Sequence, residues 1–430
     1  MKTFFVVWIG QLVSIVGSSL TGFALSIWVY QQSGSVTLLA LVMLAATVPG
    51  IIIAPFAGAL VDRWDRRLTM MGGDGAAGLA TGVVALLLFA GDLHLAWVFV
   101  LVIIGSIGNS FQEPAWTASI PMLVPKQHLG RANGLAQTGQ AVGQLLAPAI
   151  AGALLTLVGL KAVLLVDFIT FLFAVSTVAL VHIPSPKRTT AVRSLRTEAG
   201  DGWRFVKERS GLLGLLLVMA ALNFEFGFAN ILFIPLFLSF TNELVFGSVM
   251  SIAGFGMLIG TVIMGAWGGP QKRVRGLASL LSVAGLATCL VGLRPAVVPA
   301  AVGMFALMLL IPVINGTSTT LWQLKVDLDM QGRVFALRRM MAMIATPVSY
   351  LLAGPLADKV FEPLMSGPLA DTVGKVIGVG EGRGIGLLFI VMGFMLILTM
   401  VFAYAIPRIR HLEVELPDVV AEPIPEATMS

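Results

Sequence analysis

Charged residues are scarce in this chain of 430 residues. Asp, Glu, Lys and Arg make up only 11% of the residues, whereas 57% are hydrophobic. A water-soluble protein of this size needs far more charge to cover its surface. The composition therefore excludes an ordinary soluble protein and indicates a protein whose main solvent is lipid.

Disulfide, nucleotide-binding and metal-binding motifs are also missing. Cys289 is the single cysteine, which excludes intrachain disulfides, CxxC redox motifs and cysteine-rich metal sites. The chain has no GxxxxGK[ST] motif, so we do not expect it to use ATP directly, and it has no HExxH motif. No cluster of catalytic side chains and no large soluble region stand out, so we do not expect an enzyme. No metal site is predicted, because the four histidines fall at the ends of different predicted spans: His94, His128, His182 and His411.

Long apolar runs make up most of the chain. Lipid offers no partners to backbone N–H and C=O groups, so spanning segments must be helices or closed barrels. Barrel strands alternate apolar and polar residues, and these runs do not. A membrane-spanning helix takes about 20 residues. Hydropathy and turn residues predict twelve such helices, near residues 4–30, 36–60, 70–91, 95–123, 132–158, 160–182, 212–240, 244–268, 276–294, 297–322, 334–357 and 384–406.

The placement of basic residues predicts the orientation. If the N-terminus is inside, cytoplasmic segments hold all but five of the 27 Lys and Arg residues. The five outside are Lys161, Arg294, Lys359, Lys375 and Arg383. Cytoplasmic loops retain positive charge, so both termini are predicted to be cytoplasmic in a multi-pass protein of the inner (plasma) membrane.

These predictions divide the chain into four parts. They are an N-terminal six-helix bundle at 1–182, a cytoplasmic central loop at 183–211, a C-terminal six-helix bundle at 212–406 and a polar cytoplasmic tail at 407–430. The tail is rich in Glu and Pro and is predicted to be disordered. Trp203 and Phe205 could dock the central loop on the cytoplasmic face of the bundles.

The two predicted bundles resemble each other in sequence. Gly130-Arg131 and Gly332-Arg333 lie at equivalent helix ends, at an offset of 202 residues, and Gly152 and Gly354 keep the same offset. Parallel duplication is how several transporters build two bundles that rock about a central site. We therefore predict a duplication of six helices plus six.

A charged loop between the second and third predicted spans is the strongest local motif. Residues 58–67 read Gly-Ala-Leu-Val-Asp-Arg-Trp-Asp-Arg-Arg. Gly58 permits close helix contact, and Asp62 can accept hydrogen bonds from an arginine or from the N-terminus of a neighbouring helix. Such a cluster predicts a latch that holds one conformation of a cytoplasmic gate. Flanking positive charge alone would explain the arginines but not Asp62 at this spacing.

This loop resembles the signature Gly-x-x-x-Asp-Arg-x-Gly-Arg-Arg of the major facilitator superfamily, with Asp65 at the second glycine. Gly10-Gln11-Leu12-Val13-Ser14, Pro114-Ala115 and Gly130-Arg131-Ala132-Asn133 resemble its drug:proton antiporter branch, which includes macrolide-efflux and siderophore-export proteins. The resemblance implies an all-α membrane protein with twelve transmembrane helices in two six-helix bundles. The predicted gate residues are Gly58, Asp62, Arg63, Arg66, Arg67 and Asp74.

Two departures from the family pattern affect the predicted mechanism. The span-five signature Gly-x-x-x-Gly-Pro-x-x-Gly-Gly keeps Pro148 but has Ala147 and Ala151 at two glycine positions. Alanine still allows close helix packing. The arginine that some relatives carry in span four is missing from residues 95–123, so a proton pathway must use other groups.

Three carboxyl groups inside predicted spans are candidates for proton coupling. They are Glu225 in span seven, Glu113 in span four and Asp167 in span six. A charge at the bilayer centre costs about 2.5–3.5 kcal/mol even on the lenient insertion scale, so each carboxyl needs a reason to be there. Cycling between protonated and charged forms is one such reason. The alternatives are structural hydrogen bonds and gate contacts with Arg63 or Arg66.

Polar residues at similar depths are candidates for the lining of a substrate cavity: Gln11, Ser14, Asn109, Gln137, Gln140, Gln144, Asn223, Asn230 and Asn315. The three glutamines of span five recur every three or four residues and share one helix face. Each of these residues could equally serve helix packing. The chain also has 25 Phe against 8 Trp and 3 Tyr, which suits a cavity for bulky apolar substrates.

The leading hypothesis is proton-driven export of a hydrophobic or amphipathic compound, such as a drug or macrolide, by alternating access. The alternatives are a dedicated exporter of a siderophore or another secondary metabolite, uptake instead of export, and a transporter-like scaffold without efflux activity. No cofactor is predicted, because the proton gradient would supply the driving force. The predicted partners are a small-molecule substrate and the lipid bilayer, with no nucleic acid and no obligatory protein partner.

Overall fold

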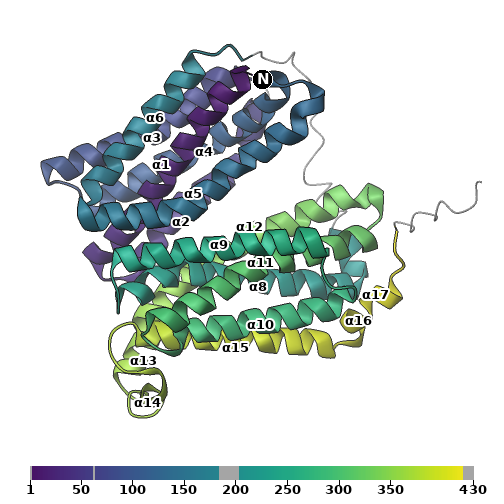
Figure 1. Ribbon diagram of the computed structural model, residues 1–430. Helices are drawn as coiled ribbons and strands as arrows, with labels where there is room; N and C mark the ends of the chain where they lie inside the picture. Colours follow the sequence, from purple (N-terminus) through teal and green to yellow (C-terminus); the bar gives the residue numbers. More distant parts are fainter. Residues whose placement is uncertain (1, 62, 184–202, 420–430) are drawn as a thin grey trace, which may run out of the picture.

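The computed structural model describes residues 2–61, 63–183 and 203–419 (Figure 1). Twelve helices in this part of the chain are long and apolar enough to cross a membrane. The first six are α1 (Lys2–Ser33), α2 (Val36–Val61), α3 (Arg66–Ala90), α4 (Leu95–Leu123), α5 (Leu129–Leu157) and α6 (Leu160–Ala179), with the short helix η1 (Lys126–His128) before α5. The other six are α8 (Ser210–Leu238), α9 (Glu243–Trp267), α10 (Arg273–Leu293), α11 (Val297–Lys325), α12 (Leu328–Leu356) and α15 (Arg383–Ala405).

The long helices form two bundles, one above the other in Figure 1. In the N-terminal bundle α1 packs on α5 and α6, and α4 packs on α2 and α3. In the C-terminal bundle α10 packs on α11 and α15, and α8 packs on α12 and α15. The predicted fold class of twelve spanning helices in two bundles of six is confirmed.

Short helices mark the two ends of the molecule. The segment between α12 and α15 carries the π-helix η2 (Ala357–Phe361), α13 (Glu362–Ser366) and α14 (Gly374–Ile377). We call this side the α13 end. The start of α1 lies at the opposite side, together with α16 (Pro407–Arg410) and α17 (Leu412–Glu415), and we call it the N-terminal end (Figure 1).

The two bundles meet at the α13 end. A Cβ atom on Gly152 of α5 would lie 2.5 Å from the carbonyl oxygen of Glu243 in α9. A Cβ atom on Gly354 of α12 would lie 2.5 Å from the Cα atom of Thr37 in α2. Only glycine allows the two backbones to approach this closely. Gln31 of α1 also donates a hydrogen bond to Glu243. The matched glycines of the sequence repeat therefore lie at the two closest crossings between the bundles.

The C-terminal segment corrects one expectation. Residues 407–419 were predicted to be disordered, but they pack on the C-terminal bundle, where Ile409 and Leu412 are buried. The Glu413 carboxylate accepts hydrogen bonds from the first two N–H groups of α10, at 2.8 and 3.1 Å. Lys325 of α11 is almost fully buried and pairs with Asp418 at 2.7 Å. The disorder prediction is wrong for these residues because a few apolar anchors and one helix-capping carboxylate outweigh a polar composition.

The described end of the central loop, residues 203–208, also packs on this bundle. Phe205 is buried in the same apolar cluster as Leu412, as the docking hypothesis expected, whereas Trp203 remains exposed. The segment therefore docks through one of the two predicted aromatic side chains.

Candidate functional site

A cavity of about 530 Å³ lies between the two bundles. The N-terminal bundle contributes Phe23, Met43 and Gln144 to its lining, and the C-terminal bundle contributes Phe226 and Asn230. Aromatic and Met side chains offer large, adaptable apolar surfaces, and the two amides add polar groups that could orient a ligand. This composition suits a small molecule that is mainly apolar but has some polar atoms.

Local features of α5 and α9 shape the wall of this interbundle cavity. Pro148 has no N–H group and interrupts the hydrogen-bond ladder of α5. The next N–H group, that of Ala149, donates to the Ser251 hydroxyl of α9 at 3.1 Å. Nearby, the rings of Phe23 and Phe246 stack across the interface, with centroids 5.3 Å apart and planes 18° from parallel. The interbundle cavity is therefore bordered by a hydrogen bond and a ring stack that each join one bundle to the other.

A second cavity, of about 370 Å³, lies inside the N-terminal bundle and is more polar. Three carboxyl residues line it: Asp74, Glu113 and Asp167. Gln11 Nε2 donates to Asp74 Oδ2 at 3.0 Å, and Gln112 Nε2 donates to Gln11 Oε1 at 2.5 Å. This chain of hydrogen bonds ties α1, α3 and α4 together.

Asp167 has its own hydrogen-bond partners in this polar cavity. Ser18 donates to Oδ1 at 3.3 Å, and Thr81 donates to Oδ2 at 3.2 Å. Both Asp74 and Asp167 are less than one-tenth exposed. Buried polar groups are costly unless they are hydrogen-bonded, and these partners reduce that cost.

Glu225 has a different environment in the C-terminal bundle. Its Oε1 atom is buried and has no hydrogen-bond partner among the described residues. Apolar side chains that include Leu222, Phe226 and Leu396 surround it. It also reaches a cavity of about 300 Å³ between α8, α12 and α15, which Phe224 and Met392 line. Four residues line both the interbundle cavity and the pocket of Glu225: Phe226, Phe233, Met308 and Ile311. A shared layer of side chains therefore separates the carboxyl from the cavity.

The predicted gate loop lies at the N-terminal end, where its arginines bind helix ends. Arg66 Nη1 donates to the Ala118 carbonyl oxygen of α4 at 2.6 Å. Arg67 donates to the Val178 carbonyl oxygen of α6 at 3.2 Å, and also to that of Ala179. A cation near the last carbonyl groups of a helix is favoured by the helix dipole. The two arginines therefore anchor the start of α3 to the ends of two neighbouring helices.

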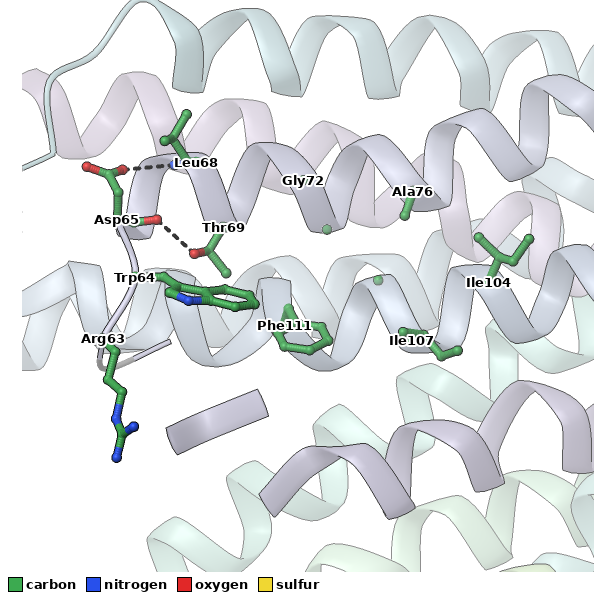
Figure 2. A pocket seen from close by; sticks show the side chains of 12 residues that line it. Arg63, Trp64, Asp65, Leu68, Thr69, Gly72, Ala76, Ile104, Ile107 and Phe111 are labelled. Carbon is green, nitrogen blue, oxygen red and sulfur yellow. Dashed lines mark hydrogen bonds between the residues drawn. The ribbon is translucent and has the colours of Figure 1, made fainter. Parts of the chain in front are cut away.

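Beside this loop, a groove of about 730 Å³ opens between α3 and α4 (Figure 2). Trp64 stacks on Phe111 of α4 at 5.9 Å, while the Arg63 side chain points away from the two helices (Figure 2). Asp65 caps α3 by accepting from Leu68 N at 2.9 Å. The groove is larger than the interbundle cavity, but it is open and lined by one bundle only, so it is not the better candidate for the substrate cavity.

Two of the predicted gate residues differ from the sequence-based interpretation. A Cβ atom on Gly58 would have no described neighbour within 4 Å, so the close helix contact expected there is not present in this conformation. Asp74 lies in the polar cavity with Gln11, away from the hydrogen bonds that Arg66 and Arg67 make. Asp62 lies outside the described residues.

The structure brings most of the other predicted site residues into two places. The polar cavity is lined by seven of them: Gln11, Ser14, Asp74, Asn109, Glu113, Gln140 and Asp167. Gln144 and Asn230 line the interbundle cavity. Gln137, Asn223 and Asn315 line neither. Asn223 donates to the Met219 carbonyl oxygen of its own helix at 2.7 Å, which favours a structural role for this residue.

Comparison with known proteins decides the family. The Major Facilitator Superfamily matches residues 7–350 of the chain. The chain belongs to the major facilitator superfamily. It is therefore a membrane transporter, and the twelve spanning helices of its described residues make it a multi-pass protein of the cell membrane.

Among its relatives, the transporter is 31% identical to macrolide efflux protein A of Streptococcus pyogenes over 370 residues, which cover 83% of this chain and 90% of that protein. It is 23% identical to the multidrug efflux pump Tap of Mycolicibacterium fortuitum, over 92% of this chain and 94% of the pump.

Solved structures agree with the fold. A bacterial homologue of the human lysosomal transporter Spinster, in an inward-facing and unoccupied conformation, matches with a TM-score of 0.71 and 14% identity. The match covers 97% of this chain and 98% of that one. A bacterial homologue of the iron transporter ferroportin, in an inward-facing state, matches with a TM-score of 0.66 and 13% identity, over 94% and 98% of the two chains.

The roles of two charged residues at the α13 end of the transporter could not be predicted from the sequence. Arg383 is only 1% exposed and donates to the Ile377 carbonyl oxygen at 3.1 Å. Its place among glycines, directly before the last predicted span, concealed this role. Asp358 contacts α2 of the other bundle. Nothing in its local sequence indicated that contact, because it depends on which helices lie side by side.

Proposed function

We propose that this transporter exports a hydrophobic or amphipathic small molecule by alternating access, with proton antiport as the driving force. The interbundle cavity is the observation that carries the proposal. Its volume of about 530 Å³ lies within the usual range for small-molecule sites, and both bundles supply its lining. A site shared by two bundles changes its accessibility when one bundle rocks against the other.

The conformation and the relatives support export by this route. The bundles are joined at the α13 end, so the cavity would open toward the N-terminal end. The distribution of basic residues favours a cytoplasmic location for the N-terminal end. The structure would then represent a state that receives substrate from the cytoplasm or the inner leaflet. The names of the relatives, macrolide efflux protein A and multidrug efflux pump Tap, agree with this direction and with a bulky amphipathic substrate.

Glu225 is the first candidate for proton exchange. A buried carboxylate oxygen without a partner is costly in apolar surroundings, and binding a proton lowers that cost by removing the charge. The pocket of this group shares four lining residues with the interbundle cavity, so a substrate there could influence its protonation. Glu113, Asp167 and Asp74 line the polar cavity of the other bundle, and they are the second set of candidates.

The gate loop would act in the opposite conformation. In our proposal Asp62 and Arg63 steady the outward-facing state by closing the N-terminal end. The anchoring of Arg66 and Arg67 to α4 and α6 supports a role in which the start of α3 moves with its bundle as one body.

Growth inhibition in a bacterium without its own pumps tests the proposal. Cells with the wild-type protein should tolerate macrolides and dyes better than cells with an empty vector, and Glu225→Gln should abolish that resistance at equal membrane expression. Glu381→Gln, at an exposed position, is the matched control. Inside-out vesicles with an acidic lumen should accumulate the same compounds. Equal sensitivity with and without the protein would contradict broad efflux and favour a single dedicated metabolite, such as a siderophore.

A further inference from the structure

The N-terminus of α2 receives its helix cap from the opposite bundle. Asp358, in the π-helix that follows α12, accepts hydrogen bonds from Val36 N at 3.1 Å and from Thr37 N at 2.8 Å. The same carboxylate accepts from the Ser35 hydroxyl at 2.7 Å. Ser35 in turn accepts from Leu38 N at 3.3 Å. The first three N–H groups of α2 are therefore satisfied, two of them by Asp358.

Two physical effects make this contact favourable. The first N–H groups of a helix have no partner within the helix, so they need an acceptor from elsewhere. The helix dipole also places partial positive charge at this end, which attracts a carboxylate. Hydrogen bonds in which the acceptor is ionised are stronger than those between neutral groups.

The second helix of the C-terminal bundle, α9, does not depend on the other bundle in this way. Asn242 caps α9 from its own chain segment, with Oδ1 accepting from Val245 N at 3.0 Å. The cap of α9 therefore persists when the bundles move apart. The cap that Asp358 gives to α2 exists only while the bundles are joined.

Close packing fixes the position of this cap. Gly354 of α12 lies against Thr37 of α2, where a Cβ atom would approach the Thr37 Cα atom to 2.5 Å. Asp358 follows Gly354 by four residues, about one helical turn. The carboxylate therefore lies directly beyond the closest crossing of the two helices, outside the lining of the interbundle cavity.

We propose that Asp358 is a latch residue of the transport cycle, which holds the α13 end closed by capping α2 across the bundle interface. It is a positioning residue, since it does not line the cavity. Opening of the cavity at the α13 end requires Asp358 to release the α2 N-terminus to water. This inference rests on the alternating-access function and on the orientation proposed above.

Labelling of a cavity cysteine tests the latch. Ser26→Cys, in a Cys289→Ser background, places one thiol in the lining of the cavity. Whole cells are treated with a membrane-impermeant maleimide, with and without Asp358→Asn. Asparagine keeps the size of the side chain but loses one acceptor oxygen and the charge. We expect the labelling rate to rise about fivefold, because the closed conformation loses one charge-assisted hydrogen bond and the attraction between the carboxylate and the helix dipole. Ser35→Ala should give a smaller rise in the same direction.

Asp371→Asn is the matched control, since Asp371 is exposed on the same segment between α12 and α15. An equal rise in the labelling rate of this control would overturn the latch, because the rise would then follow from the loss of any negative charge on the segment between α12 and α15. Unchanged labelling in both Asp358→Asn and Ser35→Ala, in protein that elutes as a single species, would also overturn it. Ser35→Ala alone decides the question if Asp358→Asn does not accumulate. A rise seen only in inside-out vesicles would support the latch and contradict the proposed orientation.

Discussion

The crossing of α5 and α9 gives a quantitative prediction for Gly152→Ala. The added Cβ atom would lie 2.5 Å from the Glu243 carbonyl oxygen, about 0.9 Å closer than the 3.4 Å at which ordinary contact begins. Both of these neighbours are backbone groups of α9, since the Cα atom of Gly247 would lie 3.4 Å from the same added Cβ atom. No side-chain rotation can relieve the overlap, so the two helices must separate.

Overpacking of this kind costs about 1–3 kcal/mol. Because the overlap disappears when the bundles part at the α13 end, the cost applies mainly to the conformation described here. The population open at that end should therefore rise by about fivefold to about 150-fold, and the thermal stability of the purified protein should fall. Labelling of Ser26→Cys from outside the cell measures the first effect, and melting in detergent measures the second.

Gly105→Ala is the matched control, because Gly105 lies within α4 and its added Cβ atom would have no described neighbour within 4 Å. Alanine is favoured over glycine in a helix by about 1 kcal/mol, so this variant should melt at the same or a higher temperature. The reasoning would be refuted if Gly152→Ala melted like Gly105→Ala and left the labelling rate unchanged.

Three further variants test other parts of the structure. Phe226→Ala should weaken transport of bulky substrates by about one to two orders of magnitude, because the Phe226 ring offers apolar area that a bound substrate would bury. The control Phe402→Ala, at an exposed position, should leave transport unchanged. Equal effects of the two variants on resistance would contradict the assigned cavity. Gln11→Leu removes a partner of the buried Asp74 and should destabilise the protein by about 1–3 kcal/mol; an unchanged melting temperature would show that Asp74 finds another partner. Lys325→Met should release the C-terminal segment, seen as faster proteolysis near its end; unchanged proteolysis would mean that the apolar anchors suffice.

The spanning helices could be predicted from the sequence almost completely. All twelve predicted spans correspond to observed helices, and most of their ends agree within a few residues. The reason is that lipid imposes one requirement along the whole chain, a continuous apolar helix, and that requirement is local in sequence. The first turn of α3 lies outside the predicted span because Arg66 and Arg67 lower its hydropathy, although Asp65 caps a helix that begins at Arg66.

The candidate site could be predicted only in part. Most of the predicted proton-coupling and substrate-cavity residues line one of two cavities. Their partners could not be predicted, because they depend on the order in which helices pack around each bundle. Asp74 illustrates the difference. Its position near the end of a span suggested the gate, but α1 and α4 bring Gln11 and Gln112 beside it.

The repeat in the sequence marks where the bundles touch, although it does not indicate how each contact is held. Gly152 and Gly354 are equivalent in the two halves, and each lies at a close crossing with the other bundle. At the first crossing, the backbone of α5 packs on that of α9, whose N-terminus has its own cap. At the second crossing, the carboxylate of Asp358 supplies the cap that α2 takes from across the interface. Both crossings therefore have a glycine that allows close approach, while the α9 N-terminus receives no cap from the opposite bundle. For this reason substitutions at the two glycines should act alike, whereas removal of a carboxylate of the opposite bundle should uncap α2 but not α9.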